Sequence, residues 1–128
     1  MVSQEEEYKL NRLVAKALGY VYNFVSGYWC VVKGVDLEEV ESHYDWSPAI
    51  KVDDAVRALV KFCQLKNCGA RIFISSTGLY GCSVLAPGGF YLEETDQELA
   101  RAICLAIAKM DDKLSALNTG GGAHASTT

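Results

Sequence analysis

The chain has 128 residues, of which 50% are hydrophobic and 22% charged, as expected for one globular domain with a single buried core. Its net charge of -4 and the lack of any Lys/Arg-rich block exclude a non-specific DNA-binding protein, but still allow a local basic pocket for a small anion. No apolar run approaches the roughly 18 residues that a membrane-spanning helix needs, so we expect no contact with a membrane.

The first predicted element is a helix over residues 5–18. Three glutamates lie in its first turn, where the helix dipole favours negative charge, and Gly19 follows as a C-terminal stop. Its apolar residues recur at three- and four-residue spacings and form one stripe: Leu10, Leu13, Val14, Ala17 and Leu18. We therefore expect this helix to pack on the core by one face.

The next segment, residues 20–51, has no clean helical or strand period. It predicts a short strand or hairpin around residues 28–32, and one turn of helix in DLEEVESH (36–43). Its aromatic residues are Tyr20, Tyr22, Phe24, Tyr28, Trp29, Tyr44 and Trp46. Trp29 and Trp46 are the natural core residues of this set. The others either pack on the core as well or form a surface for a planar ligand or an oligomer interface.

Residues 52–65 predict the second helix, and Asn67 or Gly69 can supply its left-handed cap. Pro48 fits just ahead of this helix, because it lacks an N–H group and disfavours helical geometry at the preceding residue. The apolar face of the helix is expected to contain Val52, Val56, Leu59, Val60 and Cys63.

Residues 70–93 predict a β-meander with turns at residues 76–78 and 87–89. Thr95 and Glu98 form a capping box ahead of a third helix that is expected to end near Leu117. Its stripe is Leu99, Ala102, Ile103, Ala106, Ile107, Met110 and Leu114. The Gly/Ser/Thr-rich residues 118–128 are expected to be a disordered tail, which leaves residues 1–117 as a single domain.

Three stretches carry a resemblance to a known family: LNRLVAKALGY, DWSPAIKVDDAVRALVKF and ARAICLAIAKM. With their Gly19-Tyr20 pair, Trp46-Ser47 element and AICxA helix, residues 8–110 resemble the phage ABA sandwich domain, a family of small phage and prophage proteins. The resemblance implies a phage origin and an α+β fold. In this fold, a compact α/β/α sandwich, three helices pack an antiparallel meander of about three to four strands. The family's middle helix usually carries a Trp after its Ala run, whereas this chain has Arg57 in that region.

The residues indicate no catalytic constellation, and we expect the protein not to be an enzyme. The five cysteines include no CxxC pair and are read as buried, reduced thiols of a protein in the host bacterial cytoplasm. Nothing pairs His43, the one His within the predicted domain, with a particular Cys. The acidic pairs at 53–54 and 93–94 are explained by helix ends. No cofactor and no metal site are predicted.

A ligand would be recognised by aromatic, basic and hydroxyl side chains. Arg57 and Arg71 are the best-placed cations for a phosphate, and SHYDWSP (42–48) offers an aromatic and polar cluster. The predicted ligand-binding residues are Tyr28, His43, Tyr44, Asp45, Arg57, Arg71, Ser75 and Ser76.

These observations favour a phage-encoded accessory protein that acts as a sponge against host defence. It would bind and sequester a small nucleotide-derived immune signal, in a pocket formed between subunits of a homo-oligomer. The alternative is an inhibitor that binds a host defence protein directly. A third hypothesis is a nucleotide-acting enzyme with His43 as its acid or base.

Overall fold

The computed structural model describes residues 3–127, and their side chains as far as Leu117. Its helices are α1 (Gln4–Ala17), α2 (Val52–Lys66) and α3 (Leu99–Thr127). Its strands are β1 (Val21–Asn23), β2 (Tyr28–Lys33), β3 (Asp36–Ser42), β4 (Gly69–Ile74), β5 (Tyr80–Leu85) and β6 (Tyr91–Asp96). The α+β class, the three helices and the antiparallel meander are confirmed. The expected end of the third helix near Leu117 is wrong, because α3 continues to Thr127. The side chains of the predicted tail, 118–128, lie outside the described part of the chain.

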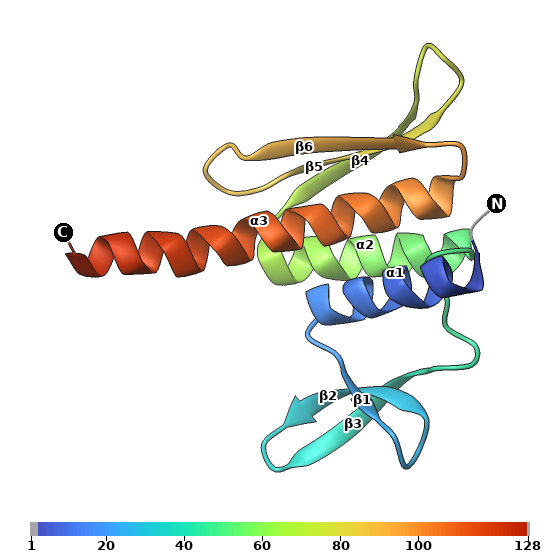
Figure 1. The fold of residues 1–128 in the computed structure, drawn as a ribbon, viewed down its shortest axis with the longest axis vertical. Helices are drawn as coiled ribbons and strands as arrows, with labels where there is room; N and C mark the ends of the chain where they lie inside the picture. The colour runs from blue at the N-terminus through green and yellow to red at the C-terminus, as the bar shows by residue number, and fades with distance from the viewer. Residues whose placement is uncertain (1–2, 128) are drawn as a thin grey trace.

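The strands form two antiparallel sheets, ordered β1-β2-β3 and β4-β5-β6. Figure 1 shows the helices in the middle layer, with β4-β5-β6 on one side and the small sheet β1-β2-β3 on the other. The sequence suggested helices around one sheet, whereas the structure places helices between two. The reason is the segment 21–42, whose strands form a sheet of their own.

Strand β3 corrects the expected turn of helix in residues 36–43. The Glu-rich sequence DLEEVES favours helix locally, but seven residues are too few to hold an isolated helix. They pair instead with β2, from Lys33 opposite Asp36 to Tyr28 opposite Ser42, with one register shift at Trp29/Cys30. The predicted strand around residues 28–32 is confirmed as β2.

Helix α2 was predicted correctly in extent but not in the face that it buries. Asn67 provides the left-handed cap, with φ of 56°. The buried residues are Asp54, Ala55, Ala58, Leu59 and Phe62. Val52 and Val60 are exposed instead, at 45% and 52%, so part of the predicted apolar stripe faces outward.

Helix α3 forms the centre of the core. Of its predicted stripe, Ala102, Ile103, Ala106, Ile107 and Met110 are buried. The expected capping box is wrong, because Thr95 belongs to β6 and lies opposite Gly81. The carboxylate of Asp96 accepts the hydrogen bond from the Glu98 amide instead, at 3.0 Å.

Buried aromatic rings connect the small sheet to the helices. Trp29 and Trp46 are buried, as predicted, and their ring centroids lie 6.3 Å apart. Tyr20 lies 5.8 Å from Trp46, and Tyr22 lies 5.3 Å from Trp29. These rings place the small sheet against α1 and the connector that leads into α2.

That connector, residues 43–51, is held by a buried polar network. The Ser47 amide donates to Asp54 Oδ2 at 2.9 Å, and the Ala49 amide donates to Asn11 Oδ1 at 2.9 Å. The Ser47 hydroxyl donates to Glu7 Oε2 at 2.7 Å and accepts from Asn11 Nδ2 at 3.1 Å. The network joins α1, the connector and the first turn of α2.

Replacing Asp54 with Ala should lower the free energy of unfolding by about 2 to 3 kcal/mol, because the buried Ser47 amide loses a charged acceptor. The matched control is Asp53→Ala, which removes an exposed carboxylate from the same helical turn and should change stability by no more than about 0.5 kcal/mol. Urea unfolding of both variants measures the difference. If Asp54→Ala and Asp53→Ala lowered the free energy of unfolding by the same amount, the hydrogen bonds of Asp54 would not contribute to stability.

Candidate functional site

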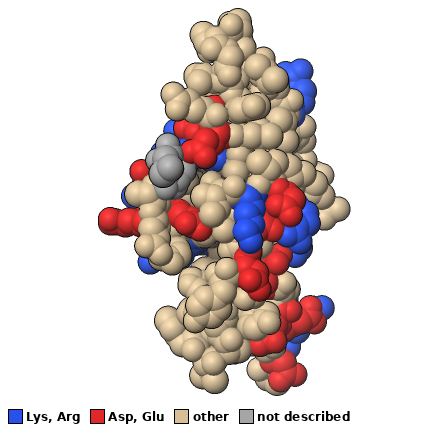
Figure 2. All heavy atoms as spheres, turned by 90° about the vertical axis from the view of Figure 1, so that its right-hand side faces the viewer, with Lys and Arg blue, Asp and Glu red and all other residues tan. Residues whose placement is uncertain are grey.

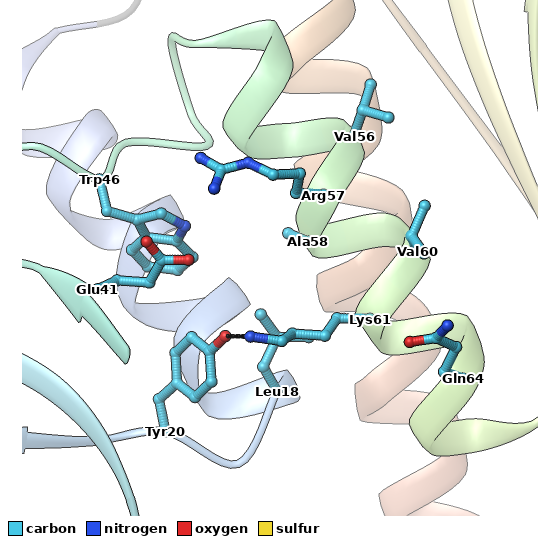
Figure 3. Close-up of a pocket in the computed structure, with 10 residues that line it drawn as sticks. All are labelled: Leu18, Tyr20, Glu41, Trp46, Val56, Arg57, Ala58, Val60, Lys61 and Gln64. Carbon is cyan, nitrogen blue, oxygen red and sulfur yellow. Dashed lines mark hydrogen bonds between the residues drawn. The ribbon is translucent and has the colours of Figure 1, made fainter. Parts of the chain in front are cut away.

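The candidate site is a cavity of about 330 Å³ between α2 and the small sheet. Helix α2 provides one wall, and the end of α1, the strand β3 and the connector provide the other (Figure 3). The lining residues are Leu18, Tyr20, Glu41, Trp46, Val56, Arg57, Ala58, Val60, Lys61 and Gln64. The cavity therefore collects side chains from four separate parts of the chain.

Two aromatic rings form the wall opposite α2. Tyr20 and Trp46 are tilted at 58° to one another and are buried in the core cluster. The Tyr20 hydroxyl accepts a hydrogen bond from Lys61 Nζ at 2.7 Å. Trp46 also contacts the buried ring of Trp29, so a planar group entering the cavity would meet rings that are already positioned.

Two cations extend from α2 toward these rings. Arg57 and Lys61 are four residues apart and share one helix face, and Figure 3 shows both side chains reaching across the cavity. Arg57 is ion-paired with Asp54, and this hydrogen bond is the main cause that raises the pKa of its guanidinium. A guanidinium has five N–H donors and an ammonium three. Both groups therefore retain donors for an anionic ligand.

Glu41 adds a carboxylate to the same cavity, on the β3 side. Burial raises its pKa, while the charges of Arg57 and Lys61 act in the opposite direction and Asp54 adds a smaller upward effect. The carboxylate thus faces two cations across a mainly apolar space (Figure 3). With donors on Arg57 and Lys61 and an acceptor on Glu41, the arrangement is suited to binding a ligand that has both acceptor and donor groups.

The predicted ligand-binding residues do not converge on this cavity. Arg57 lines this cavity. His43 instead lines a separate hollow of about 280 Å³, formed by α1, β2 and the connector. Arg71 lines a third hollow, between α2 and β4.

The other predicted residues line none of these three hollows: Tyr28, Tyr44, Asp45, Ser75 and Ser76. Ser75 accepts a hydrogen bond from the Leu79 amide at 3.1 Å and lies 2.8 Å from the Thr77 hydroxyl. The Asp45 carbonyl accepts from Lys51. The contacts of Ser75 and the Asp45 backbone are those of turn and connector geometry.

His43 contacts aromatic rings rather than an acid or a thiol. Its ring lies 6.1 Å from Tyr8, 5.1 Å from Tyr22 and 5.4 Å from Tyr44, measured between centroids. The backbone amide of His43 donates to the Gly27 carbonyl at 3.0 Å. This residue helps pack the small sheet against α1.

Sequence reasoning missed Tyr20, Glu41, Trp46, Lys61 and Gln64 as site residues. The four-residue spacing of Arg57 and Lys61 was a usable signal, because it places both on one helix face. Glu41 gave no signal, since its position depends on β3, which the sequence did not predict. Trp46 was expected in the core, and it both packs there and lines the cavity.

The cysteines are free thiols; Cys30, Cys82 and Cys104 are buried, and Cys63 and Cys68 are half-buried. Burial raises the pKa of Cys82 and of Cys104 to about 12, which keeps both protonated and weakly nucleophilic at neutral pH. Within the described residues, no three His, Cys, Asp or Glu side chains are grouped so that they could hold a metal ion. Nor does any helix of the described part have the length and apolar character to cross a membrane.

Comparisons of this chain with models of known protein families, with curated proteins and with solved structures find no match. The site must therefore be interpreted from its own geometry.

Thiol labelling of the native protein at neutral pH, at a concentration where it is monomeric, should modify Cys63 and Cys68 first, because these two residues are only half-buried. Cys30, Cys82 and Cys104 should react only when the chain is unfolded, and all five should then react. Mass spectrometry after timed alkylation identifies the modified residues. Rapid native labelling of Cys82 or Cys104 would contradict the burial and the raised pKa of these thiols.

Proposed function

We propose that this protein is a non-enzymatic binding protein that holds a small nucleotide-type anion in the cavity beside α2. The observation that carries the proposal is the placement of Arg57 and Lys61 opposite Tyr20 and Trp46. Aromatic rings stack on a planar base, and a guanidinium and an ammonium bind phosphate oxygens. A volume of about 330 Å³ lies within the range of small-molecule pockets.

The biological role proposed for this binding is sequestration. A protein that binds a nucleotide-derived immune signal without converting it lowers the free concentration of that signal, and so counters host antiviral defence. The phage origin in this proposal comes from the sequence resemblance of residues 8–110 to the phage ABA sandwich domain, which the comparison with family models does not detect.

A second candidate function is direct inhibition of a host defence protein, and the small sheet carries the observation that favours it. Phe24 and Val25, between β1 and β2, are 89% and 97% exposed, and Val35 between β2 and β3 is fully exposed. Acidic residues gather at the end of the molecule formed by this sheet, at the bottom of Figure 2, and β3 contains the exposed acids Asp36, Glu38 and Glu39. Apolar loop residues beside a charged face are typical of a protein-binding surface.

The ligand is sought by thermal shift with cyclic dinucleotides and ADP-ribose derivatives. A ligand at 100 times its dissociation constant should stabilise the fold by about 2.7 kcal/mol. Lys61→Gln should weaken binding roughly tenfold, which corresponds to about 1.4 kcal/mol, because one phosphate-binding cation is lost. Lys9→Gln changes the net charge equally at an exposed position outside the cavity and should leave the affinity unchanged. Melting temperatures unaffected by every ligand would contradict the proposal, and a stoichiometric protein captured from host lysate would then favour the second function.

The role of Glu41 is tested with inorganic pyrophosphate, which carries charge but no base. Glu41→Gln should bind pyrophosphate several-fold more tightly than the parent chain, because a negative charge facing Arg57 and Lys61 has been removed. The matched control is Glu38→Gln, on the same strand but outside the cavity. Calorimetric titration measures both variants. Unchanged or weaker binding in Glu41→Gln would show that the anion does not bind beside this carboxylate.

A further inference from the structure

The two sheets of the described chain leave four strand edges, and three of them are protected against pairing with another strand. β1 has only three residues. β3 is acidic and has a register shift in its pairing. β6 carries Glu93, Glu94 and Asp96, and two of these acids are ion-paired with α3 through Lys109 and Arg101. Short length, charge and irregular pairing are the usual means by which proteins block an edge.

The fourth edge, β4, has none of these protections. Its six residues, GARIFI, pair with β5 in unbroken register from Gly69 to Ile74. It contains no proline, and Arg71 is its only charged residue. Ile72 is 43% exposed and Ile74 is 70% exposed. A regular, apolar and exposed edge strand is a template for an additional strand.

An apolar groove of about 460 Å³ runs beside this edge, between β4 and α2. It contains Val56, Leu59, Val60, Cys63 and Ile72. In Figure 3, Val56 and Val60 point away from Trp46, and they lie at the rim between this groove and the candidate cavity, which they also line. With Val52, they repeat every four residues and form a valine stripe along the helix, in which Val52 and Val60 are exposed and Val56 is half-buried. The open edge and the apolar helix face are therefore neighbours.

We propose that a second copy of this chain covers this surface, with the two β4 strands paired antiparallel about a two-fold axis. The axis passes between Ile72 and the partner's Ile72, which joins the two three-stranded sheets into one. The valine stripe of α2 then faces the same stripe of the partner. An interface of this kind is isologous, since each copy contributes the same residues.

The side chains of β4 are complementary to those of a second copy in this register. Centred on Ile72, the pairing places Arg71 opposite the partner's Phe73 and Ala70 opposite the partner's Ile74. No two like charges then face each other across the strands, which would be destabilising. Arg71 instead meets an aromatic ring, a favourable cation–π partner. Phe73 is held in place over Gly81, where an added Cβ would lie only 2.3 Å from the ring.

The test is the mass of the full chain, without ligand, by light scattering and sedimentation over a range of concentrations. The parent chain should form a dimer. Ile72→Lys places two positive charges at the axis and should raise the dissociation constant roughly tenfold or more. The control is Val35→Lys, the same kind of change at a fully exposed position of the small sheet, and it should remain dimeric. Circular dichroism reports whether each variant is folded.

Because Ile72→Lys could lower the dimer fraction simply by misfolding, a second variant and a cross-linking experiment test the same interface independently. Val60→Lys, on the exposed face of α2, should also weaken the dimer. Ile72→Cys should form a disulfide with the partner's residue 72 on mild oxidation, because directly opposite residues in antiparallel strands have Cα atoms about 4.5 to 5.5 Å apart. The parent chain and Val35→Cys should not cross-link. A monomer mass at every concentration, or a dimer unaffected by Lys at both positions, would overturn the proposal without bearing on ligand binding.

Discussion

The carboxylate of Asp54 connects the stability of this fold to the geometry of its candidate site. It accepts a hydrogen bond from the Ser47 amide, with a donor–acceptor distance of 2.9 Å, and it is also ion-paired with Arg57. A buried carboxylate is costly unless several donors compensate it, and here one donor comes from the connector and one from the helix itself. The first interaction fixes the connector over the start of α2, and the second sets the position of the Arg57 guanidinium. The position of Trp46 depends on the same contact, because it immediately precedes Ser47.

The cavity follows from the way in which the small sheet is attached. Large rings, rather than a continuous sheet or a long helix contact, bridge the space between β1-β2-β3 and the helices. Rings meeting at tilted angles leave space between them, and here that space is bordered by α2. Lys61 bridges it by a hydrogen bond to the Tyr20 hydroxyl, with Nζ 5.2 Å from the centre of that ring. Small movements of the sheet would therefore change the width of the cavity.

The parts of the fold that could be predicted from the sequence are those set by local periodicity. The stripe of α3 and the turns of the meander follow from residue spacing and turn chemistry. The strand β3 does not, since its residues prefer helix and only pairing with β2 makes them a strand. The face of α2 was misassigned for a related reason, because Val52 and Val60 satisfy the helical period yet lie where no described element covers them. The site depends on such long-range placement, and so Arg57 was predicted while Glu41 was not.

The charges of the cavity bear on the kind of ligand that it would favour. Arg57 and Lys61 are balanced by Asp54 and Glu41, so no excess of positive charge attracts anions to this site. The cavity must then discriminate between ligands by the positions of its side chains, with hydrogen-bond donors on α2, an acceptor on β3 and aromatic rings between them. A simple phosphate satisfies the donors but brings its charge close to Glu41. A nucleotide can place its phosphate at the cations while an amino or ring N–H group of its base donates to the Glu41 carboxylate, which offsets the cost of burying that group. This balance supports a ligand with both a phosphate and a base over a plain anion.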